Sequence, residues 1–577
     1  MIKHKQWLWI IIFPLVIAPV SCSFFTQKTG KEDNFTRLIT TEDTTKLWYK
    51  SASFYTLDVE VFKDSDGDGF GDFKGLTQKL GYIDSLGFDA IWLAPFQPTP
   101  GKDDGYDVAD FYSVDKNLGT LEDFKAFINS AKEKNIRIIM DLVINHTSIE
   151  HPWFKEARQS KGSRYRNWYT WSGKRPSNYD KGMVFPGVQK TTWTLDTVSN
   201  EYYYHRFYEF QPDLNTQNEE VKAEIKKIIK YWTDLGIAGF RLDGVPFYIE
   251  VPETKGNKFE RKYEMLVEMR KYVESIRPDA IILGEANVPP EENELYFGKN
   301  GDGMHMMFNF WANQHLFLSL ATDNPKPIKK ALEASQDIPY NSQWGQFLRN
   351  HDEVDLGRLT NRERNKVFER FGPEKRMQSY DRGIRRRMGP MMANNAKHLK
   401  MAYSVLFAMP STPVVRYGEE IGMGDNLFLE ERLSVRTPMQ WSDDKHGGFT
   451  TGNKTVRPVI DTGEYRYQKV NVAYQQADSL SLLRFVDRLV ELRKTCPEIA
   501  FGKYELLDID KHILAIKYSW QGKELIAVHN FSPEIIEFTL ENISGYTELL
   551  KSSTLTPVNS KHTMALDGYG FGWYRTQ

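Results

Sequence analysis

The sequence predicts an α/β fold: a (β/α)8 TIM barrel, with a domain inserted after the third strand and an antiparallel β-sandwich at the C-terminus. Three observations favour this fold. Short β-rich runs alternate with helical patterns from Trp48 onward, which is typical of parallel strands joined by helices. Eight strand candidates can be counted, the number that closes such a barrel. After about residue 500 the pattern changes to successive strands.

The strand candidates are short and apolar. They lie at residues 53–62, 90–95, 137–145, 239–245, 280–286, 304–310, 344–350 and 412–418. Helical periodicity separates them, for example at 121–134 and 219–234. The gap after the third strand is long, and its first part, about 146–213, is rich in Trp, Tyr, Gly and Pro. We therefore expect the barrel at 47–499, with an irregular inserted domain at about 146–213, and the sandwich at 500–577.

The N-terminus has the features of an export signal. Basic residues at positions 3–5 precede an apolar run at 7–20, which is short for a membrane span and suits a signal peptide. The run ends at Cys22 and resembles a bacterial lipoprotein signal, in which Cys22 would carry the lipid. A plain cleaved signal or an uncleaved anchor remains open. Residues 23–46 are poor in apolar side chains and are predicted to be a flexible tether. We expect an exported protein that contacts the membrane only through this anchor.

Composition excludes some partners. The formal net charge is −2 with 26% charged residues, so a nucleic-acid partner is not expected. Aromatic residues make up 14% of the chain, which fits stacking on sugars, although most aromatic residues serve cores. Only Cys22 and Cys496 are present, which excludes a disulfide framework.

Charged and imidazole side chains occur where the predicted strands end. In a (β/α)8 barrel the C-terminal strand ends form the rim that carries catalytic groups. The residues at these ends are Asn145, His146, Arg241, Asp243, Glu285, His351 and Asp352. Each could belong to a structural ion pair, but a whole set on one rim is hard to explain by packing.

Three carboxylates on one rim suit the cleavage of a glycosidic bond. Arg241 and Asp243 lie two residues apart and point to the same side of a strand, so we expect Arg241 to hold Asp243 ionised, as a nucleophile requires. The alternative is a buried ion pair that only stabilises the fold. Glu285 follows an apolar strand, where desolvation should raise its pKa and suit it to general acid/base catalysis. Asp352 would bind sugar hydroxyls and help to distort the ring.

The set Asp141…Asn145-His146, 239–243, Glu285 and 350–352 resembles the four signature regions of glycoside hydrolase family 13, the α-amylase family, and the resemblance covers about residues 47–577. It implies a retaining mechanism on α-glucosides, with Asp243 as nucleophile, Glu285 as acid/base and Asp352 as transition-state stabiliser. It also implies sugar contacts from Asp103, Tyr106, His146, Arg241, His351 and Arg432. A binding-only relative would be expected to lack one of the three carboxylates.

The segment 64–72 places carboxylates at alternating positions of a glycine-rich loop, a spacing that suits Ca²⁺. It resembles the calcium loop of α-glucosidases in this family, with ligands from Asp64, Asp66, Asp68, Asp72 and the carbonyl of Phe70. An unmetallated acidic turn is the alternative. A second calcium site is suggested by resemblance alone, and its expected ligands are Asn145, Asp213, Glu250 and the carbonyls of Phe247 and Tyr248.

Within the family, the segments 348–358, 381–387 and 415–425 resemble the maltose α-glucosyltransferases, or trehalose synthases. The implied substrate is maltose or a malto-oligosaccharide. For the basic run 382–387 a solvated helix face is the alternative. Two departures from that subfamily, a different loop at 251–257 and Leu433 in place of an aspartate, leave an exported α-glucosidase open.

Overall fold

The computed structural model describes residues 45–251, 260–393, 395–540, 545–552 and 563–577. The predicted signal peptide at 1–22 and nearly all of the predicted tether at 23–46 lie outside these ranges. None of the helices in the described ranges combines the length and apolarity needed to cross a membrane.

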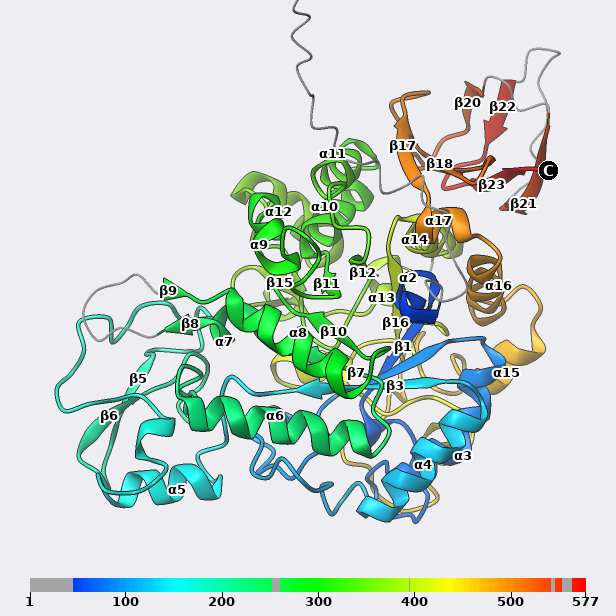
Figure 1. The fold of residues 1–577 in the computed structure, drawn as a ribbon. Helices are drawn as coiled ribbons and strands as arrows, with labels where there is room; N and C mark the ends of the chain where they lie inside the picture. Colours follow the sequence, from blue (N-terminus) through cyan, green and yellow to red (C-terminus); the bar gives the residue numbers. More distant parts are fainter. Residues whose placement is uncertain (1–44, 252–259, 394, 541–544, 553–562) are drawn as a thin grey trace, which may run out of the picture. The chain divides into compact units, whose positions relative to one another are not determined.

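Eight parallel strands close into a barrel, which confirms the predicted fold class (Figure 1). The order around the barrel is that of the chain, and the last strand pairs with the first. The strands are β1 (Phe54–Leu57), β2 (Ala90–Leu93), β3 (Arg137–Leu142), β7 (Gly239–Leu242), β10 (Ile281–Gly284), β11 (Met306–Phe308), β12 (Gln343–Phe347) and β16 (Thr412–Arg416). All eight predicted strands are present, each shorter than its apolar run.

The first predicted strand, 53–62, is the most strongly shortened. After Leu57 the chain turns into a 3₁₀ helix, Val59–Val61. The carboxylate of Asp58 bonds the buried Arg416 at 2.7 Å, so Asp58 anchors the chain at the rim. The apolar residues beyond it are buried in helical geometry instead.

Helices connect the strands and pack around them. The main ones are α3 (Phe73–Ser85), α4 (Leu121–Glu133), α6 (Glu219–Asp234), α8 (Glu264–Ile276), α10 (Phe310–Ala321), α11 (Lys326–Ala334), α12 (Asn361–Phe371), α14 (Ala396–Ala408) and α16 (Leu482–Lys494). Both α4 and α6 match the predicted helices. Side chains at their N-termini, such as Asn218 before α6, accept backbone hydrogen bonds and define where these helices begin.

Between β3 and α6 the chain forms a small irregular layer. It contains α5 (Pro152–Gln159) and an antiparallel sheet of β4 (Trp171–Ser172), β6 (Glu201–Tyr204) and β5 (Trp193–Asp196). Phe154 stacks on Trp171, with ring centroids 5.5 Å apart, and meets Tyr203 edge-on. Aromatic contacts therefore hold together a segment that has little regular structure.

The C-terminal part is a pair of antiparallel sheets, as predicted. One contains β17 (Lys503–Leu507), β18 (Ile513–Trp520), β19 (Lys523–Asn530), β23 (Phe571–Thr576) and β21 (Tyr546–Lys551), and the other β20 (Ile536–Thr539) and β22 (Thr563–Leu566). Ile513, Val528, Phe538 and Leu566 share a core between the two sheets. The opposite face of the larger sheet packs into the main core through Trp573.

Candidate active site

The three predicted catalytic carboxylates lie around one cavity of about 490 Å³. Of the nine predicted catalytic and sugar-contact residues, eight line this cavity: Asp103, Tyr106, His146, Asp243, Glu285, His351, Asp352 and Arg432. The ninth, Arg241, is buried and binds the carboxylates. The barrel topology therefore gathers side chains that are far apart in the sequence.

Arg241 is the centre of the charge network. Its guanidinium lies 2.6 Å from Asp243 Oδ1, 2.8 Å from Glu285 Oε2 and 2.5 Å from Asp141 Oδ1. The strand register explains the third contact, because Arg241 on β7 stands directly opposite Asp141 on β3. Asp141 is held in turn by the indole nitrogen of Trp92 at 3.0 Å. One buried cation thus orients two of the predicted catalytic carboxylates.

Burial has the largest effect on the pKa of both Asp243 and Glu285. It raises the pKa of Glu285 to about 7 against the opposing charge of Arg241, in the predicted direction. It also raises the pKa of Asp243 to about 6, since desolvation outweighs Arg241. Arg241 lowers the pKa of Asp243, in the predicted direction, but the burial of Asp243 has the larger effect. The order of the two values still makes Asp243 the stronger acid of the pair.

Asp352 differs from Asp243 and Glu285 in its charged neighbours, which include two arginines. Its Oδ1 lies 2.9 Å from Arg432 and 3.1 Å from Arg436, and its Oδ2 lies 3.1 Å from His351 Nε2. Burial lowers the pKa of His351, which keeps that ring neutral. Although burial opposes it, the charge interactions with His351, Arg432 and Arg436 hold the pKa of Asp352 well below its usual range. Asp352 is therefore an anion at neutral pH.

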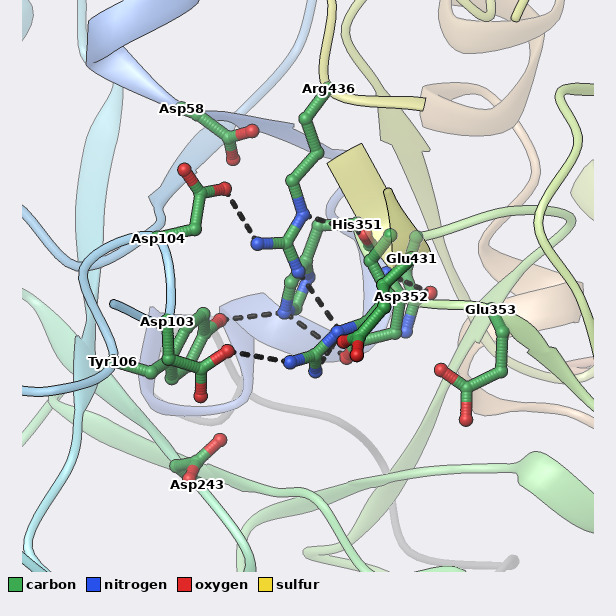
Figure 2. A network of polar contacts seen from close by, with 12 residues as sticks. Asp58, Asp103, Asp104, Tyr106, Asp243, His351, Asp352, Glu353, Glu431 and Arg436 are labelled. Carbon is green, nitrogen blue, oxygen red and sulfur yellow. Dashed lines mark hydrogen bonds and ion pairs between the residues drawn. The ribbon is translucent and has the colours of Figure 1, made fainter. Parts of the chain in front are cut away.

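Asp103 and Tyr106 form the opposite wall of the pocket. Asp103 accepts hydrogen bonds from Arg432 at 2.7 Å and from Gln211 at 2.9 Å. Tyr106 lies parallel to His351 and its hydroxyl is 2.6 Å from His351 Nε2. Figure 2 shows Asp103, Tyr106, His351 and Asp352 facing one another, with Asp104 and Arg436 beyond them. His146 joins this wall through the carbonyl of Tyr106, 3.0 Å from its Nε2.

Several residues at the pocket were not singled out as site residues from the sequence. Asp141 and Arg436 bond the predicted residues directly, and Asp141 stands within the first signature region, which was the available signal for it. Phe185 lines this cavity, and Tyr208 and Glu431 line a neighbouring cavity that shares Arg432 with it. Their contacts are made between distant parts of the chain, so no local pattern marks them.

The acidic loop 64–72 brings together Asp64, Asp66 and Asp72, whose carboxylate oxygens lie within 4.8 Å of one another. Asp64 is buried and accepts backbone hydrogen bonds from Asp66, Gly67 and Gly69. Asp72 also caps α3 through the amide of Gly75. Among the described residues this is the one group of three or more potential metal ligands found, and its all-oxygen donor set fits a hard cation.

The residues of the second predicted calcium site already have protein partners. Glu250 forms ion pairs with Arg206 and Arg261, and Asp213 accepts the backbone amide of Arg206 at 2.9 Å. Burial nevertheless raises the pKa of Asp213 to about 7. Tyr248 uses its carbonyl to accept the hydroxyl of Thr216 at 2.8 Å. The arginine charge therefore already balances part of this acidic group.

The basic run 382–387 is not a solvated helix face. It contains β15 (Gly383–Ile384), and its arginines point inward to the loops around the pocket. Arg382 bonds the carbonyl of Val184 at 2.7 Å, and Arg385 bonds those of Glu431 and Leu427, each at 2.8 Å. Arg387 is fully buried against Glu419.

Most of the divergent loop at 251–257 falls within 252–259, outside the described residues. Leu433 lines a second, larger cavity of about 760 Å³, which shares Arg432 with the catalytic cavity.

A closed barrel with three carboxylates around one pocket defines a glycosidase or transglucosylase. The alpha-amylase catalytic-domain model matches residues 59–502, and the chain belongs to the α-amylase family. It is 39% identical to the trehalose synthase of Thermus thermophilus over 539 residues, which are 92% of this chain and 55% of that protein. It is 30% identical over 569 residues to the oligo-1,6-glucosidase of Bacillus cereus, which covers 87% of this chain and 94% of that enzyme. The trehalulose synthase MutB from Pseudomonas mesoacidophila superposes with a TM-score of 0.74 at 27% identity, covering 92% and 99% of the two chains.

Proposed function

We propose that this chain is a retaining maltose α-D-glucosyltransferase that interconverts maltose and trehalose. The observation that carries the proposal is the arrangement of Asp243, Glu285 and Asp352 around one pocket whose far wall is the Asp103–Arg432 ion pair. A pocket closed there accepts one terminal glucosyl unit rather than the middle of a chain. Its volume of about 490 Å³ lies in the usual range for small ligands.

In this mechanism Asp243 attacks the anomeric carbon while Glu285 donates its proton to the glycosidic oxygen. The released glucose then rotates within the pocket, so that its anomeric hydroxyl faces the glucosyl-enzyme. This hydroxyl attacks the anomeric carbon, and its proton passes to Glu285. Asp352 and its two arginines bind the hydroxyls of the distorted ring. The pKa values of about 6 for Asp243 and about 7 for Glu285 support these separate roles.

The test is to incubate the purified protein with maltose and follow the products over time by NMR. We expect trehalose to appear ahead of free glucose, because transfer requires the released glucose to stay close to the glucosyl-enzyme. Glucose as the only product would overturn the transferase assignment. No reaction with maltose would overturn the substrate as well.

The second candidate is an α-glucosidase, for which water is the acceptor. The likeness to an oligo-1,6-glucosidase and the presence of Leu433 in the larger cavity beside Arg432 favour it. The same NMR time course separates the two, since only a glucosidase would release glucose from the start without trehalose.

We also propose that Ca²⁺ binds the loop of Asp64, Asp66 and Asp72, with Asp68 and the carbonyl of Phe70 as further ligands. The buried Asp64 and the convergence of three carboxylates support this structural role. A second calcium at Asn145, Asp213, Glu250, Phe247 and Tyr248 would have to displace Arg206 from Glu250. The raised pKa of Asp213 indicates that a further positive charge would be stabilising there.

Export as a lipoprotein is our proposal for residues 1–22. Expression in a bacterial host with labelled palmitate should label the full chain, and Cys22→Ser should remove the label and release the protein from the membrane fraction. Labelling that persists in the Cys22→Ser protein would contradict the assignment.

A further inference from the structure

Three separate segments meet beside Arg432, at the edge of the pocket. They carry Phe185 and Tyr208 from the segment after β3, Tyr380 from the loop before β15, and the pair Glu431 and Arg432. The ring of Phe185 lies 4.9 Å from that of Tyr208 and 4.9 Å from that of Tyr380. These residues, with Phe207 and Phe210 beside them, form a local apolar cluster separate from the barrel core. We call Phe185, Tyr208, Tyr380 and Glu431 the roof.

Glu431 joins two parts of the roof. Its Oε2 accepts hydrogen bonds from the hydroxyls of Tyr208 at 2.9 Å and of Tyr380 at 2.8 Å. Its carbonyl accepts from Arg385 at 2.8 Å. The φ angles of Glu431 (+40°) and Tyr380 (+54°) lie in the left-handed region, which such residues adopt only where their surroundings hold them. The hydrogen bond from the Tyr380 hydroxyl joins these two strained residues to each other.

The next residue is Arg432, whose position depends on this anchoring. Its guanidinium bonds Asp103 and Asp352 and lies 5.1 Å from the ring centroid of Phe185. Arg432 thus spans the pocket from one wall to the other.

Arg432 also separates two cavities. The cavity of about 490 Å³ contains the three carboxylates, and a second cavity of about 760 Å³ lies behind it. The residues that line both are Asp103, Tyr106, His351 and Arg432. The second cavity is polar, with Asp58, Glu60 and Asp104 in its lining, and it can hold water. Movement of Arg432 would connect this water to the catalytic pocket.

We propose that Glu431 is a positioning residue that keeps the Arg432 wall closed, and that it sets the share of glucosyl-enzyme that reacts with glucose rather than with water. This inference rests on the proposed transglucosylation. In both reactions the ester bond between Asp243 and the anomeric carbon breaks, and a hydroxyl oxygen of glucose or water bonds that carbon. The hydroxyl proton passes to Glu285, and Asp243 leaves as a carboxylate. Glu431 takes no part in these bond changes and affects only whether glucose or water lies next to the glucosyl-enzyme.

The test compares Glu431→Ala with Glu431→Gln, using maltose with added ¹³C-labelled glucose. NMR then measures labelled disaccharide and trehalose, which report transfer, against the net rise in total free glucose. The net rise reports hydrolysis, because each transfer to free glucose consumes one glucose molecule and releases another. We expect Glu431→Ala to raise the ratio of hydrolysis to transfer at least threefold. Glu431→Gln retains an oxygen that can accept both tyrosine hydroxyls, so it should stay close to the wild-type ratio. The double variant Tyr208→Phe/Tyr380→Phe should behave like Glu431→Ala.

Tyr112→Phe is the matched control, because Tyr112 makes a similar hydrogen bond to Glu224 at 2.7 Å but lines neither cavity. A wild-type ratio in Glu431→Ala would overturn the inference, as would an equal change in Glu431→Gln. A labelled disaccharide other than trehalose or maltose would instead overturn the proposed maltose–trehalose reaction. The ratio still tests Glu431 in that case, so the two failures are distinguishable.

Discussion

At the scale of the residue, the decisive feature is that the guanidinium of Arg241 forms ion pairs with two carboxylates that have different pKa values, Asp243 and Glu285. Arg241 contacts both Asp243 and Glu285, yet burial leaves Glu285 the weaker acid. A retaining mechanism needs this inequality, since one group must attack as an anion while the other donates a proton. Desolvation is the largest contribution to the pKa of both groups.

Replacing Glu285 with glutamine should abolish turnover of maltose while leaving sugar binding intact. The amide keeps the shape but has no transferable proton, so we expect kcat to fall by about 10²- to 10⁴-fold. Steady-state kinetics and a separate binding titration check this. Glu292→Gln is the control, because Glu292 lines the same cavity but pairs with Arg261 at 3.0 Å. Equal turnover in Glu285→Gln would remove Glu285 from the acid/base role.

The pH dependence of kcat/KM should be bell-shaped. Activity should rise as pH increases through about 6, where Asp243 becomes an anion, and fall above about 7, where Glu285 loses its proton. The optimum should therefore lie between these values. An aryl α-glucoside with a good leaving group needs less acid assistance, so its activity should fall less on the alkaline side. A flat profile from pH 5 to pH 9 would contradict these assignments.

At the scale of the element, the apolar runs predicted all eight barrel strands because burial on both faces leaves a clear mark on the sequence. Strand ends were also predictable, which is why Asp243 and Glu285 could be located. The inward role of Arg385 could not be predicted, since a basic run looks the same locally whether it faces water or carbonyl groups. Glu431 was missed for the same reason: its partners, Tyr208 and Tyr380, are distant in sequence.

The acidic loop before α3 yields a prediction about metal removal. If Ca²⁺ binds the folded loop, a chelator should lower the melting temperature, because a ligand that binds only the native state stabilises it. At a calcium concentration of about 100 times Kd the loss is about 2.7 kcal/mol. Calorimetry with and without chelator measures it. Asp64→Asn should abolish the calcium dependence, whereas Asp508→Asn, at a fully exposed side chain, should retain it. An unchanged melting temperature in chelator would exclude a structural metal here.

At the scale of the whole described unit, the C-terminal sheets and the barrel share one apolar core. Trp573 on β23 is fully buried in the main core cluster, together with Leu514, Ile516 and Phe571 of the same sheet. Its indole nitrogen donates to Ser404 on α14 at 3.0 Å, and Tyr518 donates to the carbonyl of Ala408 at 2.6 Å. Such continuity indicates that the sandwich stabilises the barrel. None of the described residues of the sandwich lines the catalytic cavity.

Trp573→Ala should therefore destabilise the protein without changing its chemistry. Loss of a buried tryptophan costs about 3–5 kcal/mol, and because the core is shared we expect one unfolding transition at a lower temperature. The product ratio and KM for maltose, measured well below that temperature, should match the wild type. Ile535→Ala is the control, since Ile535 is 65% exposed and its loss should change stability by no more than about 0.5 kcal/mol. Two separate transitions, with only one of them shifted, would show that the sandwich unfolds independently of the barrel.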